Sequence, residues 1–169
     1  GMKALYLNTT GSYNTASGYT SLYTNTTGDY NVASGSSALF KNTTGSYNVA
    51  VGANSLFENT TGAENTALGL EALQSNTTGS NNTALGLKAG YSNSTGSNNV
   101  FIGYKAGYNE TGSNKLYISN GASSNLITGD FSSGALSLGQ TSGTVSVLNN
   151  LDVDGTANLD AVDIDGAVD

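Results

Sequence analysis

The sequence predicts an all-β fold in which each repeat forms one coil of a solenoid. A turn motif, Asn-Thr-Thr-Gly, recurs every 17 residues. Each copy is followed by a short segment in which apolar and polar residues alternate, and glycines separate these segments. Self-similarity at a fixed period is the sequence signature of a repeat architecture. The motif begins at Asn8, Asn25, Asn42, Asn59 and Asn76, and it returns in altered form at Asn93 and Asn109.

The composition excludes most catalytic chemistry. The 169-residue chain contains no Cys, His, Trp, Pro or Arg. Without Cys or His there is no disulfide, no thiolate or imidazole metal site and no nucleophile–base pair of the usual kinds. We therefore predict that the protein is not an enzyme, and that it has no catalytic residues, no metal ligands and no cofactor.

The charge argues against nucleic-acid partners, and the short apolar runs argue against membrane insertion. The formal net charge is -7, and five Lys are the only basic side chains. A nucleic-acid-binding surface has to neutralise phosphates, which this composition does not favour. No apolar run approaches the roughly 20 residues that cross a bilayer. We expect neither nucleic-acid binding nor membrane insertion.

A first strand follows each turn. Each segment starts with Asn and ends with Gly four residues later, as in Asn48-Val-Ala-Val-Gly52. Such alternation is typical of a strand that shows its two faces to different surroundings. One face carries only a small residue, so we expect it to line the interior of a narrow roll. This inner column consists of Ala16, Ala33, Ala50, Ala67 and Ala84.

A second strand is expected in the other half of each unit. It would contain Ser21-Leu22, Ala38-Leu39, Ser55-Leu56 and Ala72-Leu73. A helix is the rival interpretation for segments such as residues 70–74. About six residues between glycine turns are too few for a stable helix, so we favour the strand.

The outer face of the first strand becomes apolar toward the C-terminal coils. Apolar patches of this length mark association surfaces, and a roll with an Ala and Gly interior buries little area of its own. We therefore predict that this stripe is buried between identical chains. The predicted interface consists of Val49, Val51, Leu68, Leu85, Val100 and Ile102.

Stacked asparagines form a second candidate feature. Their amides, one per coil, can hydrogen-bond along the stack and satisfy turn carbonyls. Asn8-Thr-Thr10 and its copies also match the glycosylation acceptor Asn-x-Thr, although turns select the same residue types. The expected ladder consists of Asn14, Asn31, Asn48, Asn65, Asn82 and Asn99.

Three tyrosines precede the first members of this ladder. Tyr13, Tyr30 and Tyr47 recur at the 17-residue period, so they should stack one per coil. Such a column suits the binding of sugar rings, or stacking of the tyrosines on each other, and we favour the second interpretation.

Two segment types resemble known fibrous proteins. Asn48-Val-Ala-Val-Gly52, Asn65-Thr-Ala-Leu-Gly69 and Asn99-Val-Phe-Ile-Gly103 resemble the head repeats of YadA-like trimeric autotransporter adhesins. Residues 75–90 are similar to phage tail-fibre repeats that precede an endosialidase-type chaperone, and residues 115–139 strengthen that likeness. The resemblance covers residues 4–139 and implies a left-handed parallel β-roll wound as a homotrimer. The unit here is longer than that of the adhesins, which implies an enlarged turn.

The chain is expected to have three parts. Residues 1–112 form the β-roll repeats, 113–140 a short β-strand transition segment, and 141–169 an acidic tail in β structure or partly disordered. Calcium binding is an alternative role for the tail, but its acids lack the spacing that wraps a cation, so a solvated strand face is favoured. The acids are Asp152, Asp154, Asp160, Asp163, Asp165 and Asp169.

These features predict a structural and adhesive segment of a trimeric fibre, in a phage tail or on a cell surface, that serves attachment to a host or surface. The expected partners are two sister copies and an unidentified host receptor or surface glycan. Two alternatives stay open. The Thr columns that follow each motif Asn could bind ice, and Glu58 and Glu64, which flank one turn, could serve a glycan-degrading tail spike.

Overall fold

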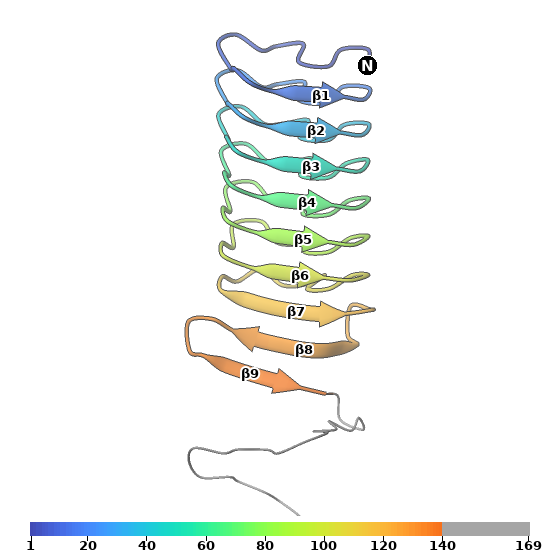
Figure 1. Cartoon of the computed structure of the whole chain (residues 1–169), viewed down its shortest axis with the longest axis vertical. Coiled ribbons are helices and arrows are strands. Elements are labelled where there is room, and N and C mark those ends of the chain that lie inside the picture. The colour runs from blue at the N-terminus through green and yellow to red at the C-terminus, as the bar shows by residue number, and fades with distance from the viewer. Residues whose placement is uncertain (140–169) are drawn as a thin grey trace, which may run out of the picture.

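The computed structural model describes residues 1–139 and consists of nine strands in one sheet, joined in chain order (Figure 1). The expected acidic tail, 141–169, lies outside these residues. No helix within residues 1–139 is long and apolar enough to cross a membrane. The strands are β1 (Thr15–Ser17), β2 (Val32–Ser34), β3 (Val49–Val51), β4 (Thr66–Leu68), β5 (Thr83–Leu85), β6 (Val100–Ile102), β7 (Lys115–Ser119), β8 (Asn125–Asp130) and β9 (Ala135–Leu138).

The first seven strands pair in parallel, each with the equivalent strand of the next coil. Ala33 pairs with Ala50, and Ala50 with Ala67, so the register advances by one 17-residue repeat at each step. The prediction of an all-β parallel solenoid with coils of about 17 residues is confirmed.

The predicted second strand is wrong. Each coil has one three-residue strand, and the segment that carries the repeated Leu is a series of turns. Leu39 and Leu56 have φ values of 50° and 49°, a left-handed conformation that costs a bulky residue roughly 1–2 kcal/mol. Inter-coil hydrogen bonds continue nevertheless, because Leu39 N–H donates to Ser55 O at 3.0 Å. Residues in left-handed conformation turn the chain back within a few residues, which an extended strand cannot do.

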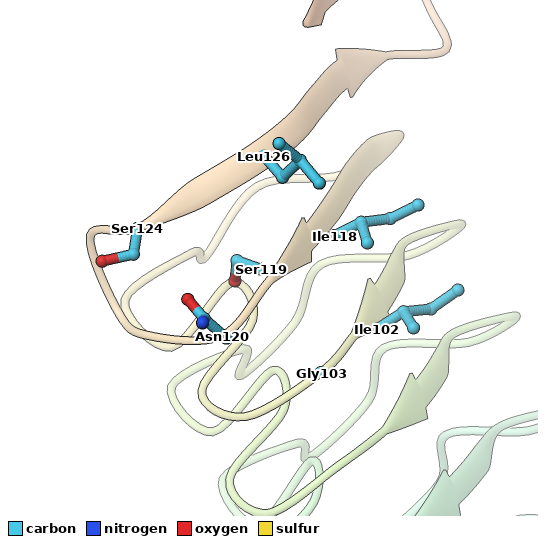
Figure 2. Close-up of a pocket in the computed structure, with 7 residues that line it drawn as sticks. All are labelled: Ile102, Gly103, Ile118, Ser119, Asn120, Ser124 and Leu126. Carbon is cyan, nitrogen blue, oxygen red and sulfur yellow. The ribbon is translucent and has the colours of Figure 1, made fainter. Parts of the chain in front are cut away.

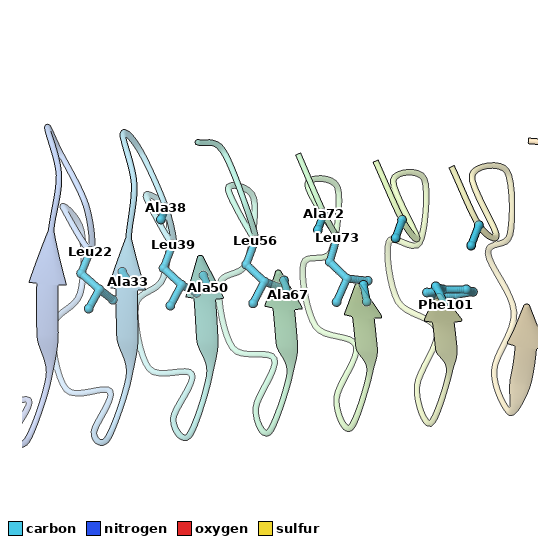
Figure 3. Packing of buried hydrophobic residues seen from close by; sticks show 13 residues of the cluster. Leu22, Ala33, Ala38, Leu39, Ala50, Leu56, Ala67, Ala72, Leu73 and Phe101 are labelled. Carbon is cyan, nitrogen blue, oxygen red and sulfur yellow. The ribbon is translucent and has the colours of Figure 1, made fainter. Parts of the chain in front are cut away.

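The interior is a column of alanines faced by a column of leucines (Figure 3). Ala33, Ala50 and Ala67 are fully buried on the inner side of their strands, as the alternation predicts. Leu39 and Leu56, also fully buried, fill the remaining space from the opposite side of the coil. Burial of each Leu contributes about 1.5–3 kcal/mol, which offsets the cost of its backbone conformation.

One aromatic ring replaces this pattern at the C-terminal end of the roll. Phe101 stands at the alanine position of β6 and is fully buried, whereas Gly90 and Gly107 stand at the leucine positions of the two adjoining coils. A Cβ added at either glycine would clash with the Phe101 ring. The ring therefore fills the space that two leucines would otherwise occupy.

The sheet continues beyond the coils as an antiparallel meander. β7 is parallel to β6 but antiparallel to β8, and β8 is antiparallel to β9. A register shift between Ile118 and Ser119 interrupts the pairing of β7 with β8. Within residues 113–139 the structure thus contains three strands, in the part of the chain expected to be a β-strand transition segment.

Candidate functional site: the outward face of the sheet

The outward side chains of the coil strands form two columns, which we call the strand face. Side chains directly opposite each other in a ladder lie on the same side of a sheet, so the register assigns these columns. One column consists of Thr15, Val32, Val49, Thr66, Thr83, Val100 and Leu116, and the other of Ser17, Ser34, Val51, Leu68, Leu85, Ile102 and Ile118.

All six residues of the predicted interface lie on the strand face. Leu68 and Leu85 are 44% and 45% exposed, and Val49 is 37% exposed, although each flanks a fully buried alanine. Val51, Val100 and Ile102 are half-buried. The outward direction of these side chains is confirmed by their exposure, while their burial between chains remains a prediction.

The apolar column extends further than the repeats indicate. Ile102 pairs with Ile118, Ile118 with Ile127, and Ile127 with Leu138, so the column continues across β7, β8 and β9. Leu138 is 52% exposed. Sequence reasoning missed Ile127 and Leu138 because they lie outside the repeat. The alternation in Lys115–Ser119 and Ala135–Leu138 was a usable signal, but the register had to be known.

No charged side chain stands on the strand face between Thr15 and Ile118, within the part of the chain that the structure describes. The column just past each strand glycine is uncharged too, from Tyr19 to Tyr104. The ionic groups lie elsewhere, as in the Lys41–Glu58 pair at 2.6 Å and the Lys88–Glu71 pair at 3.1 Å. Depletion of charge is typical of the buried core of a protein interface.

A shallow apolar pocket lies where the coils meet the meander (Figure 2). Ile102 and Ile118 project from neighbouring strands, and Leu126 from β8 lies beside them. Gly103, Ser119, Asn120 and Ser124 complete the lining. The pocket is thus part of the strand face, and it could receive an apolar side chain of another molecule.

The predicted asparagine ladder is fully hydrogen-bonded inside the roll. Asn65 Nδ2 donates to Gly79 O at 2.9 Å and to Asn48 Oδ1 at 3.1 Å, and Asn65 Oδ1 accepts from the backbone N–H of Asn82 at 3.0 Å. From Asn31 onward the ladder members are fully buried. Their contacts join one coil to the next, which is a structural role.

The motif asparagines form a second ladder. Asn59 Nδ2 donates to Asn42 Oδ1 at 2.8 Å and to Gly62 O at 2.9 Å. Asn25, Asn42, Asn59 and Asn76 are fully buried. A glycan cannot be attached to these nitrogens in the folded chain, so the glycosylation interpretation does not hold for these four sites.

The Thr column next to the motif Asn is used by the backbone. Thr43 Oγ1 donates to Thr60 O at 3.0 Å, and Thr26 Oγ1 donates to Thr43 O at 2.9 Å. The hydroxyls of this column therefore spend their protons on the neighbouring coil. The following column, exemplified by Thr44 and Thr61, is exposed but precedes the turn glycine, so it does not lie on a flat strand.

The tyrosines of the sequence-predicted column stack on one another. The ring centroids of Tyr13 and Tyr30 are 4.7 Å apart, and those of Tyr30 and Tyr47 are 5.1 Å apart. Each ring face is largely taken by its neighbour, which leaves little face for a sugar. A second stack, absent from the sequence prediction, joins Tyr6, Tyr23, Phe40 and Phe57. Its signal was an aromatic residue directly after the repeated Leu.

The carboxylates do not form a catalytic pair of the glycosidase kind. Glu58 is bound to Lys41, and Glu64 has a left-handed backbone at an exposed turn. Glu110 lies at the end of the roll, where Tyr117 Oη donates to its Oε2 at 2.7 Å. Burial raises the pKa of Glu110, but the hydrogen bonds from Tyr117 and from the backbone N–H of Gly112 outweigh this and lower it. A carboxylate with a lowered pKa is not suited to donate a proton to a leaving group.

A second pair closes the same end. Lys115 Nζ donates to Asp130 Oδ2 at 2.6 Å. This bond, together with donation from Ser132, holds the pKa of Asp130 well below its usual range. Burial and the hydrogen bond to Glu110 raise the pKa of Tyr117 to about 12. The four side chains Glu110, Lys115, Tyr117 and Asp130 therefore form a structural cap over the last coil.

No three Asp or Glu side chains in residues 1–139 come close enough together to hold a metal ion. Comparisons with protein-family models, with curated proteins and with solved structures give no match. The strand face is therefore assessed by its own chemistry.

Proposed function

We propose that the chain is a structural and adhesive segment of a homotrimeric fibre, in a phage tail or on a cell surface, and that its strand face is the interface between the copies. The single observation that carries the proposal is the uncharged, apolar strand face. Exposed leucines and valines recur there in successive coils, and the column continues through the meander.

The slender interior supports self-association. One coil contributes an alanine and a leucine to the core, so each chain buries little apolar area of its own. Removal of the strand face from water would add a second core parallel to the first. At about 25 cal/mol per Å², this second burial is comparable in kind to the first.

A threefold arrangement suits the geometry of the face. The column from Val51 to Leu138 runs along the roll, so copies related by an axis parallel to the roll can place equivalent residues against each other at every level. The resemblance to trimeric adhesin heads and phage fibres favours three copies over two, and it also favours a left-handed coil. Such a bundle is a rigid shaft that projects an attachment region away from its base.

Light scattering after size-exclusion chromatography tests the assembly. We expect a mass three times the 17.0 kDa of one chain. Leu68→Asp combined with Leu85→Asp should yield monomers or aggregates, because two charges would be buried at the centre of the interface. Thr61→Asp is the matched control, since it adds a charge at an exposed turn away from the strand face. A folded wild-type monomer with the strand face open to water would contradict the proposal.

The adhesive role needs its own measurement. A glycan array and binding to intact cells should detect attachment by the trimer, and a shaft that only connects other parts would bind neither. Replacement of Tyr13, Tyr30 and Tyr47 by Ser distinguishes a binding role of the stack from a structural one. We expect binding to survive this replacement, because the ring faces are occupied by each other.

A further inference from the structure

Three exposed tyrosines are held in contact on the outside of the first coils. Tyr13, Tyr30 and Tyr47 are 75%, 47% and 58% exposed. The first pair of rings is inclined by 13° and the second by 4°, with the centroid separations given above. The backbone holds this arrangement, since Tyr30 N–H donates to Ser12 O and Tyr47 N–H to Asp29 O, both at 3.0 Å.

This column differs chemically from the other long ring stack. In the stack of Tyr23, Phe40 and Phe57, the last two members have no phenol. In the Tyr13 column every ring carries one, and Tyr30 has a phenol neighbour on each side. Loss of one electron and one proton converts an exposed phenol into a phenoxyl radical, so only the Tyr13 column offers three consecutive rings of this type among the described residues.

We propose that Tyr13, Tyr30 and Tyr47 form an oxidative cross-linking site, at which a one-electron oxidant joins neighbouring coils through dityrosine. With a peroxide oxidant, two phenols each give up one hydrogen atom and the peroxide is reduced to two waters. The two radicals then form a carbon–carbon bond between ring carbons ortho to the hydroxyls. The hydrogen on each of these carbons moves to the oxygen, which restores both phenols.

The fold favours coupling within the chain. Partners held in contact react at effective concentrations far above those of separate molecules in solution. The bond would close a loop of one 17-residue repeat, since Tyr30 and Tyr47 are equivalent positions of adjoining coils. In a chain with no cysteine, this site supplies a covalent link between coils that a disulfide provides elsewhere.

Peptide mapping tests the site sharply because of where the lysines lie. Cleavage after Lys41 and Lys88 releases residues 42–88, in which Tyr47 is the only tyrosine. Cleavage after Lys3 and Lys41 releases residues 4–41, which contain Tyr13 and Tyr30. The full-length protein is treated with a haem peroxidase and hydrogen peroxide, then digested with trypsin. We expect residues 4–41 joined to 42–88 at a mass two hydrogens below the sum, with dityrosine fluorescence and single-chain mobility on a denaturing gel.

Two conservative variants locate the bond. Tyr30→Phe keeps a ring in the stack but cannot form a phenoxyl radical, so the linked peptide pair should disappear. Tyr19→Phe removes an exposed tyrosine that belongs to no described stack, and the pair should persist. The Tyr91 and Tyr108 rings, 5.0 Å apart, report the activity of the oxidant through a link between residues 89–105 and 106–115.

Three results would overturn the proposal. The first is a 4–41/42–88 link that survives Tyr30→Phe. The second is Tyr47 recovered mainly in links between two chains, seen as 42–88 joined to itself. The third is no Tyr47 link in the wild type while the Tyr91 and Tyr108 link forms.

Discussion

Phe101 and Gly107 occupy each other's usual space: the ring of Phe101 lies where the leucine of the repeat would be, and Gly107 leaves that space empty. The backbone does not require glycine there. Gly107 has a φ of 57°, close to the 50° of Leu73 at the equivalent position. Volume rather than backbone conformation therefore excludes a side chain.

Gly107→Leu should overpack the end of the roll and cost about 1–3 kcal/mol in the free energy of unfolding. Phe101→Ala should cost about 3–5 kcal/mol through the cavity that it leaves. Combined with Gly90→Leu, the two changes recreate the alanine and leucine core of earlier coils, and much of the loss should be recovered. Urea unfolding of the single and combined variants measures this. Strictly additive losses would show that the sites are not coupled.

Asn59 should be costly to replace because both of its neighbours in the ladder depend on it. In Asn59→Ala, the Nδ2 of Asn76 loses its acceptor and Gly62 O loses a donor, both in the buried interior. We expect a loss of about 1–3 kcal/mol. Asn8→Ala is the matched control, since Asn8 lies at the half-buried N-terminal end of the same ladder. Equal unfolding midpoints for the two variants would contradict a role for burial.

Thr43 and Thr44 are adjacent residues of one turn with different duties. Thr43→Val removes the hydrogen bond from its Oγ1 to Thr60 O and should cost about 0.5–1.5 kcal/mol. Thr44→Val changes an exposed side chain and should alter stability by less than about 0.5 kcal/mol. Denaturant titration of the pair provides the comparison. A larger effect at Thr44 would show that the exposed column has a further contact, for example between chains.

Tyr117 should make the protein less stable in alkaline solution. Its pKa rises from the ordinary 10.0 to about 12 on folding, so its contribution is fully present below pH 10 and is lost as pH rises toward 12. The contribution is on the order of 1 kcal/mol once solvent screening of this partly exposed group is allowed for. Tyr117→Phe should flatten this dependence, measured by unfolding across that range. The phenolate absorbance lost in the variant should titrate later than that of the other tyrosines.

The parts of the fold that repeat could be predicted, because a period converts directly into a column. Ala50 and Asn48 recur at fixed positions, so their interior location followed from alternation and spacing alone. The left-handed backbone of Leu39 could not be predicted in this way. A small residue followed by a buried Leu is compatible both with an extended strand and with a tight reversal, and only the length of the coil decides between them.

Features outside the period were beyond this reasoning. The exchange of Ala and Leu for Phe101 and Gly107 is a compensation in three dimensions between residues that belong to different columns. The continuation of the apolar face to Leu138 depends on two antiparallel registers, one of which is interrupted by the shift at Ile118. The cap of Glu110 and Tyr117 likewise forms only where the last coil ends.

The constant register of the coils makes the length of the roll adjustable in whole units. Val32 pairs with Val49, and Val49 with Thr66, so consecutive coils are joined by the same type of contact. Excision of residues 49–65 would fuse Asn48 to Thr66 and regenerate an intact repeat, Asn-Thr-Ala-Leu-Gly. Unequal recombination within such a gene could therefore lengthen or shorten the shaft while both ends and every type of neighbour relation stay the same.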